Sequence, residues 1–97
     1  MSWAQAEFHD LELGDARRTQ RLIKLVDDLS ARPTGSIPQA CGGWAETKAA
    51  YRLLDNPAVE WREILEVHTT RTVARMAGQP VVLCIQDTTE LDFTTQP

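Results

Sequence analysis

Apolar side chains recur at helical spacing in the segment after Asp15. They fall at three- and four-residue steps, which is the period of one buried helix face. The positions are Leu22, Ile23, Leu25, Val26 and Leu29. Asp15 is a good N-cap, because its carboxylate accepts hydrogen bonds from backbone N–H groups of the first turn. The pattern therefore predicts a helix that begins at about residue 16 and packs through one face.

The same spacing predicts two further helices, over about 45–54 and about 59–77. Pro57 ends the first, because proline disfavours helical angles in the residue before it, and Gly78 and Pro80 end the second. The periodic positions of the helix over 59–77 are Trp61, Ile64, Leu65, His68, Thr72 and Met76. The inward positions expected in the first helix are Ala49, Ala50, Leu53 and Leu54.

Aromatic and histidine side chains on these faces are interpreted first as structural. We expect Trp44, Tyr51 and Trp61 to lie mainly in the core, although Trp44 follows two glycines and has ligand contact as an alternative. His68 is expected to be a hydrogen-bonded histidine of the core or its boundary.

The remaining segments predict less regular structure. Residues 3–8 suit a short helix or turn, and residues 30–43 contain two prolines and three glycines, which predicts a long loop. Val81–Ile85 is a continuous apolar run typical of a buried strand, and the alternating residues 90–93 suggest a second strand. The expected fold is thus mainly α: a helical domain of about three helices over 1–79, then the first β-hairpin of a sheet over 80–97.

Charge is unevenly distributed along the 97 residues, whose formal net charge is −4. Residues 14–52 carry a net +3, whereas the segments before and after them are acidic. This pattern favours a nucleic-acid surface in the middle of the chain. Cys41 and Cys84 lack metal-ligand spacing, which argues against zinc. No apolar run approaches the roughly 18 residues of a membrane span, so we expect no membrane partner.

Three arginines crowd the first turns of the helix after Asp15. A helix N-terminus carries partial positive charge, so Arg17, Arg18 and Arg21 are unfavourable there unless an anion is bound. They are interpreted as contacts to a nucleic-acid backbone, with solvated surface residues as the alternative. Asp87 follows the apolar run, a position that suits a metal ligand, and a turn cap is its alternative.

Five segments together resemble the N-terminal portion of bacterial cut-and-paste DDE transposases of the insertion-sequence-four family, Tn-five type. They are Trp3 to Phe8, Leu13-Gly14-Asp15-x-Arg17-Arg18-Thr19-x-Arg21-Leu22, Ala50-Tyr51-Arg52, Asn56-Pro57 and Ile85-x-Asp87-Thr88-Thr89. The resemblance covers nearly the whole chain, in order and with similar gaps. In that family a helical domain binds the inverted repeat at the transposon end, and an RNase H-like α/β core follows.

The resemblance implies a role for particular side chains. Arg17, Arg18, Arg21 and Arg52 would contact DNA, and Asp87 would be the first catalytic carboxylate of the triad, a ligand of Mg²⁺ or Mn²⁺ in the full-length enzyme. Lys24, Arg32 and Lys48 are added as DNA contacts on charge and position. The expected partner is double-stranded DNA at transposon ends, in the cytoplasm and associated with the nucleoid when bound.

The sequence stops before the other two carboxylates of that family. We therefore expect an N-terminal fragment that is inactive alone and needs no cofactor, with homodimerisation through regions absent here. Two alternative functions remain: a non-catalytic or inhibitory truncated transposase that still binds DNA, and a helical protein-interaction domain that ignores DNA. The net charge of −4 favours the last of these.

Overall fold

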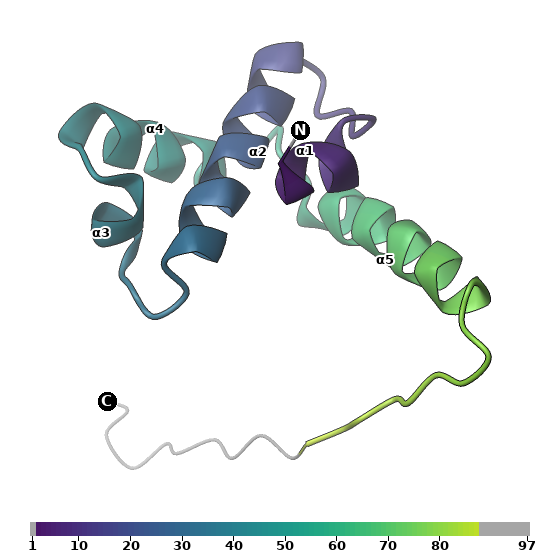
Figure 1. Ribbon diagram of the computed structural model, residues 1–97. Coiled ribbons are helices and arrows are strands. Elements are labelled where there is room, and N and C mark those ends of the chain that lie inside the picture. The colour runs from purple at the N-terminus through teal and green to yellow at the C-terminus, as the bar shows by residue number, and fades with distance from the viewer. Residues whose placement is uncertain (1, 88–97) are drawn as a thin grey trace, which may run out of the picture.

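The computed structural model of the protein describes residues 2–87, and helices dominate it. Five helices occur in that range (Figure 1): α1 (Trp3–Phe8), α2 (Ala16–Ala31), α3 (Ile37–Cys41), α4 (Trp44–Leu54) and α5 (Trp61–Ala77). The prediction of a mainly α fold is confirmed. Residues 3–8 form a short helix, one of the two forms expected there, and α3 is a helix that was not predicted. Among residues 2–87, none of the helices has the length and apolar content that crossing a bilayer requires.

α2 is the central helix of the fold. It packs against α1, α3 and α4, whereas α5 packs against α1 (Figure 1). The predicted apolar face of α2 is confirmed: Leu22, Ile23 and Leu25 are buried, and Val26 and Leu29 pack partly buried against the same core. The other buried members of this core are Ala4, Phe8, Leu11, Leu13, Ala50 and Leu53.

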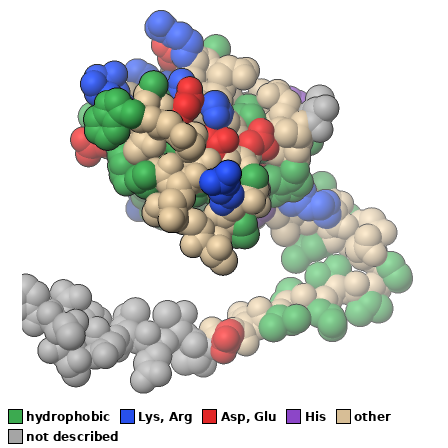
Figure 2. Space-filling model, turned by 60° about the vertical axis from the view of Figure 1, so that its left-hand side comes forward, with side chains coloured by type: hydrophobic (Ala, Val, Ile, Leu, Met, Phe, Trp, Pro, Cys, Tyr) green, Lys and Arg blue, Asp and Glu red, His purple; other side chains and the backbone are tan. Residues whose placement is uncertain are grey.

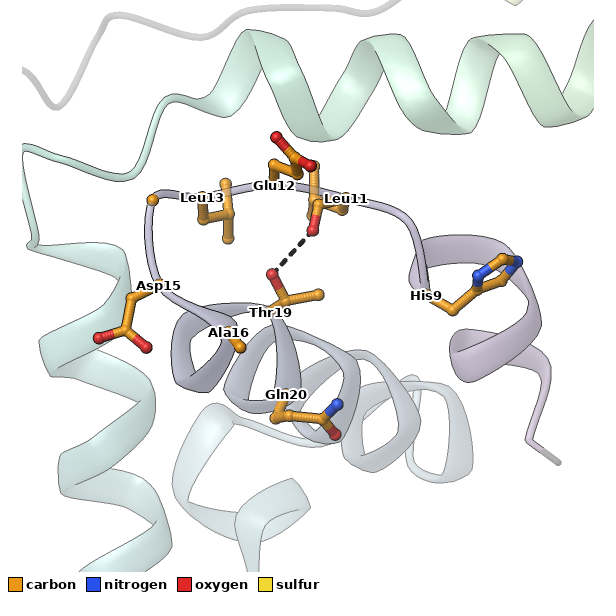
Figure 3. A pocket seen from close by; sticks show the side chains of 9 residues that line it. His9, Leu11, Glu12, Leu13, Asp15, Ala16, Thr19 and Gln20 are labelled. Carbon is orange, nitrogen blue, oxygen red and sulfur yellow. Dashed lines mark hydrogen bonds between the residues drawn. The ribbon is translucent and has the colours of Figure 1, made fainter.

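The linker between α1 and α2 is fixed to the core before the helix begins (Figure 3). Leu11 and Leu13 are buried, and the Thr19 hydroxyl donates a hydrogen bond of 2.9 Å to the Leu11 carbonyl. Gly14 then turns the chain with a φ of 85°, a left-handed conformation that glycine adopts without steric cost. As predicted, Asp15 is the N-cap of α2. The linker thus sets the place of the arginine-rich turns.

The prediction of a continuous loop over 30–43 is wrong, because α3 forms within it. Ser36 and Gln39 make a reciprocal capping box, in which each side chain bonds to the other residue's backbone N–H. Pro38 lies in the first helical turn, where its missing N–H costs nothing, and Gly42 ends the helix with a φ of 80°. Pro38 and Gly42 therefore mark the beginning and the end of a short helix.

The aromatic residues predicted as core are exposed, and that interpretation is wrong. Trp44 is 78% exposed, Tyr51 and Trp61 are about half exposed or more, and Leu54 is 57% exposed although its helix is correctly predicted. α4 instead buries Thr47, Ala50 and Leu53. The helical period gave the right spacing, but the width of the covered stripe depends on the neighbouring helices, which the sequence does not specify.

The helix α5 packs less extensively against the core than its apolar residues suggested. It begins at Trp61, two residues later than expected, and it has no buried residue. Only Ile64 and Val67 from this helix pack, partly buried, against the core cluster. Since α5 packs against the short α1 rather than against a broad surface, most of its length is left to solvent.

The chain leaves the helical body after α5 (Figure 1). Residues 81–87 form no regular secondary structure, and the side chains of Val81, Leu83 and Ile85 are largely exposed. Within residues 2–87, the predicted strand over 81–85 therefore has no sheet partner. Residues 90–93 lie outside the described residues, so the β-hairpin and the domain boundary near residue 80 stay predictions.

Candidate nucleic-acid interface

Arg17 is the most accessible of the arginines at the start of α2. Its side chain is 93% exposed and pairs only within its own turn, with Nη2 3.1 Å from Asp15 Oδ2. The Arg17 backbone N–H also donates to Asp15 Oδ1 at 2.8 Å. These contacts, led by the side-chain hydrogen bond, lower the pKa of Asp15, which is therefore a carboxylate at neutral pH. The guanidinium lies at the surface and is available to an outside anion.

Arg18, by contrast, is turned toward the protein. Its Nη1 donates a hydrogen bond of 2.9 Å to the carbonyl of Leu13, in the linker before the helix. A Cβ added at Gly14 would lie 3.1 Å from this same nitrogen, so the glycine and the arginine share a confined space. Arg18 thus has a structural contact that Arg17 lacks, although both were predicted to bind DNA.

Arg21 and Lys24 belong to an ionic network between α2 and α4. Arg21 Nη1 lies 2.5 Å from Glu46 Oε2, and Lys24 Nζ lies 3.6 Å from the same oxygen. Lys24 Nζ is also 2.9 Å from Asp28 Oδ2. The hydrogen bond to Asp28 is the main reason that the pKa of Lys24 is raised, so its charge is retained at neutral pH. The network fixes the second turn of α2 against the first turn of α4.

A second basic surface lies on the outer face of α4. Lys48 and Arg52 are exposed there, and neither side chain makes a hydrogen bond or ion pair within residues 2–87. They line a shallow depression, which we call the α4 face; its residues are Trp44, Lys48, Tyr51, Arg52, Leu54 and Asp55. Two exposed aromatic rings beside two unpaired cations are unusual for a surface that contacts only water.

The seven predicted DNA contacts do not form a single uninterrupted basic patch. On the face of the helical body that Figure 2 shows, Lys and Arg side chains are interspersed with Asp and Glu. Arg32 lies apart after α2, where its Nη1 donates to the carbonyl of Gln39. The structure therefore leaves the side chains of Lys48 and Arg52 without a partner among residues 2–87 and pairs the exposed Arg17 only with Asp15. The other four side chains are engaged in contacts elsewhere in the protein.

Of the exposed aromatic residues of the α4 face, Tyr51 was missed as a candidate site residue, and Trp44 was given ligand contact only as the alternative. Trp44, Lys48, Tyr51 and Asp55 follow one another at steps of three and four residues, so their shared helix face was visible in the sequence. Their hydrophobicity favoured the core instead. The charged side chains of Lys48 and Arg52 on the same face were the signal that this face of the helix is exposed to solvent.

Asp87 lies beyond α5 in the extended segment, as an exposed residue. Among the described residues, no three side chains of the types that bind metals come together. Mg²⁺ takes six oxygen ligands in octahedral geometry, several of them water, and Asp87 would supply one of them. The catalytic and metal-binding role of Asp87 therefore stays a prediction.

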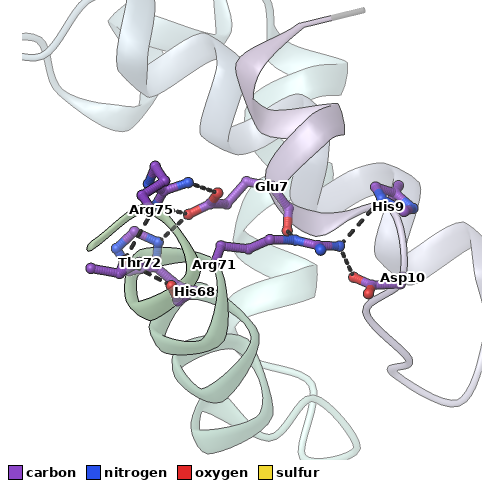
Figure 4. Close-up of polar contacts among 7 residues, drawn as sticks. All are labelled: Glu7, His9, Asp10, His68, Arg71, Thr72 and Arg75. Carbon is purple, nitrogen blue, oxygen red and sulfur yellow. Dashed lines mark hydrogen bonds and ion pairs between the residues drawn. The ribbon is translucent and has the colours of Figure 1, made fainter. Parts of the chain in front are cut away.

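A buried carboxylate joins α1 to α5 (Figure 4). Glu7 is 2% exposed and accepts hydrogen bonds from Arg75 Nη1 and Nη2 at 2.7 and 3.0 Å. His68 Nδ1 lies 2.5 Å from Glu7 Oε2, which confirms the prediction of a satisfied histidine. Arg71 extends the joint by donating to the Glu7 carbonyl and pairing with Asp10. Three polar side chains of α5 thus hold it to α1.

The stability of the fold is expected to fall at acid pH through Glu7. The hydrogen bonds from Arg75, opposed by burial and aided by His68, lower the pKa of Glu7 from 4.5 to about 2. Because the pKa is lower in the folded state, the stabilisation is complete above the unfolded value and is lost as the pH falls from about 4.5 toward 2. We expect a loss on the order of 2 kcal/mol, since Arg75 and His68 are half exposed and partly screened.

Urea unfolding measured across this pH range checks the effect of Glu7. The Glu7→Gln variant should be less stable than the wild type at pH 7 and should lose less stability on acidification. An identical pH dependence in the two proteins would show that Glu7 is not the group responsible.

A comparison with known protein families found a match for most of the helical part of the chain. Residues 1–59 match the model of a family described as transposase DNA-binding. The matched range contains α1 to α4, including all seven basic residues discussed above, and ends before α5. It covers more than half of the 97 residues.

Proposed function

The chain belongs to the transposase DNA-binding family, and we propose that it binds the terminal inverted repeats of a transposable element through α2 and α4, for cut-and-paste transposition. DNA is thus the partner, and the α4 face is the observation that carries the proposal. Lys48 and Arg52 are exposed there without an acidic partner among residues 2–87, beside the exposed ring of Trp44. Such a surface suits a polyanion that also offers flat bases and apolar methyl groups.

The order of elements around α4 supports its role as the recognition helix, the helix that enters the major groove of DNA. The short α3 packs against α4, and only Gly42 and Gly43 separate the two helices. Two packed helices joined by a glycine-containing turn are typical of DNA-binding domains in which the second helix enters the major groove. In that geometry the first turns of α4 approach base edges, and exposed cations along the helix contact phosphates.

The start of α2 supplies a second contact. Arg17 pairs only with Asp15 in its own turn, and such an exposed pair contributes at most about 1 kcal/mol, so exchange for a phosphate costs little. The Arg21–Glu46 bridge places α2 and α4 side by side at this point. A duplex lying across both helices would therefore meet cations from each.

The net charge of −4 does not oppose this function, because much of the acidity lies elsewhere or is internally paired. Residues 53–97 carry a net −4, and Glu7 is buried against arginine and histidine. Only the local charge within about a Debye length, roughly 10 Å, acts strongly on a bound strand. The exposed cations of α2 and α4 thus dominate where the DNA would lie.

A direct binding experiment tests the proposal. A duplex from the end of the element that encodes this chain, and a scrambled duplex of equal composition, are titrated with the 97-residue protein at several salt concentrations. We expect tighter binding to the end duplex, and a salt slope that falls by about one unit in Lys48→Ala. Absence of binding to either duplex at low salt would contradict the proposal.

A protein-interaction function is the second candidate, and the outer surface of α5 favours it. Trp61, Leu65 and Val73 are exposed on this helix, and the apolar segment over 81–85 follows it. Exposed apolar side chains of this kind are found where another protein docks. The same titration distinguishes the two candidates, because a domain that binds only protein leaves both duplexes unbound.

The assignment to the DDE type rests on the resemblance of Ile85-x-Asp87-Thr88-Thr89. In a transposase of that type, Asp87 would be one of several carboxylates that bind Mg²⁺ or Mn²⁺, which would activate the attacking oxygen and stabilise the leaving one. The chain's own described residues contribute DNA binding, and we assign no reaction step to them.

A further inference from the structure

We propose that Glu46 is a positioning residue that makes Arg21 a reader of bases rather than of phosphates. This inference rests on the proposed DNA-binding function. Its starting point is the ionic network between α2 and α4, in which Arg21 and Lys24 share the carboxylate of Glu46 and Lys24 also pairs with Asp28. Two cations and two carboxylates balance there. Lys48 and Arg52 have no acidic partner among residues 2–87, and the Arg17–Asp15 pair is far more exposed, so it exchanges for a phosphate at little cost.

Charge balance weakens the attraction of Arg21 for phosphate. Contacts to the DNA backbone derive their strength from uncompensated positive charge that displaces counterions. Because Glu46 neutralises Arg21 at 2.5 Å, a phosphate approaching this guanidinium meets a nearly neutral pair and a repelling carboxylate. Arg21 therefore contributes little to sequence-independent binding.

The same contact suits Arg21 for base recognition. A guanidinium has five N–H donors, and the Glu46 contact uses Nη1, so donors remain for a second acceptor group. Fixing a long side chain before binding reduces the entropy lost on forming a bidentate contact. Guanine presents two acceptors in the major groove with the spacing that arginine matches. The side chain is still 36% exposed, so an edge of the guanidinium is accessible.

The structural contribution of Glu46, which bridges α4 to α2 and lies in the first turn of α4, is small. Its side chain is 37% exposed, and exposed ion pairs contribute little to folding stability. It accepts both Arg21 and Lys24 through the same oxygen, Oε2. A carboxylate placed beside a DNA-binding surface lowers affinity for any duplex, so its benefit lies in discrimination between sequences.

The test compares Glu46→Gln with the wild type on the end duplex and the scrambled duplex. Glutamine keeps the size of the side chain and removes its charge, which releases Arg21 and Lys24 toward phosphates. We expect affinity for the scrambled duplex to rise, the salt slope to steepen by about one unit, and the preference for the end duplex to fall roughly tenfold. Arg21→Ala should lower the preference similarly and leave the salt slope almost unchanged.

Asp55→Asn is the matched control, because Asp55 is an exposed acid of the α4 face that is not part of the network. A general field effect would make Asp55→Asn equivalent to Glu46→Gln. In a background with Arg21→Ala and Lys24→Ala, the Glu46→Gln effect should disappear, whereas that of Asp55→Asn should persist. Unfolding midpoints of all variants separate these effects from damage to the fold.

Two results would overturn the inference while leaving DNA binding intact. One is that Glu46→Gln binds both duplexes as the wild type does, and the other is that its effect survives without Arg21 and Lys24. Equal weakening of both duplexes in Arg21→Ala, with a slope reduced by one unit, would show Arg21 to be a phosphate contact. If the wild type binds neither duplex, the proposed function itself fails.

Discussion

Replacing Arg17, Lys48 and Arg52 together by alanine is expected to lower affinity for the end duplex by roughly a thousandfold at low salt. All three are exposed, and Lys48 and Arg52 have no partner among residues 2–87 that would compensate for their loss. A charged hydrogen bond contributes at least about 1.4 kcal/mol, a factor of ten for each contact. The salt slope should fall by about three units, which equilibrium titrations at several salt concentrations measure.

Arg62→Ala is the control for this loss of positive charge. Arg62 is an exposed arginine on α5, outside the matched range, where it pairs with Glu60 at 3.8 Å and lies over the Trp61 ring. Its removal should change affinity by less than about threefold, because distant surface charges are screened. If Arg62→Ala weakens binding as much as Lys48→Ala does, the interface is not confined to α2 and α4.

Leu53→Ala is expected to reduce the free energy of unfolding by about 2–5 kcal/mol, the cost of emptying a buried leucine site. Leu53 is 5% exposed and belongs to the core cluster with Leu22 and Ala50. A domain of this size has only about 5–15 kcal/mol of stability, so the variant should be partly unfolded at moderate temperature. Urea denaturation followed by circular dichroism measures the change.

The neighbouring residue provides a matched control for the same substitution. Leu54 is 57% exposed, and Leu54→Ala should change the free energy of unfolding by less than about 1 kcal/mol. The sequence alone favoured both leucines as inward residues, so the pair also tests the orientation of α4. Equal destabilisation by the two variants would show that α4 is rotated relative to its described position.

The positions of the helices were predicted well where the signal lies within a single helix and its caps. The N-cap at Asp15, the apolar period of α2 and the stop at Gly78 all depend on residues within a few positions of one another. The capping box of Ser36 and Gln39 was an equally local signal, but the nearby prolines and glycines were given more weight than it was.

Burial was harder to predict because it depends on which helices meet. Trp44, Tyr51 and Trp61 have apolar rings at helical spacing, yet no other helix covers them in residues 2–87. The pairing of Glu7 with His68 and Arg75 joins residues more than sixty positions apart, and no periodicity reveals it. The same holds for Arg21 and Glu46, whose contact depends on the packing of α2 against α4.

The sequence therefore pointed to the basic residues of the candidate site, whose role in DNA binding stays a prediction, but not to their arrangement. Charge pattern and resemblance identified the basic residues of α2 and α4. Only the packing distinguishes the exposed Arg17, Lys48 and Arg52 from Arg18, which donates to Leu13, and from Arg21, which pairs with Glu46. The roles of these arginines differ because their surroundings differ.

Backbone amide chemical shifts, recorded by NMR while the 97-residue protein is titrated with the end duplex, test the central claim most directly. The account predicts that the largest changes occur in the first turns of α2 and along α4, with α5 little affected. Changes confined to α5, with residues 16–24 and 44–55 unmoved, would contradict it.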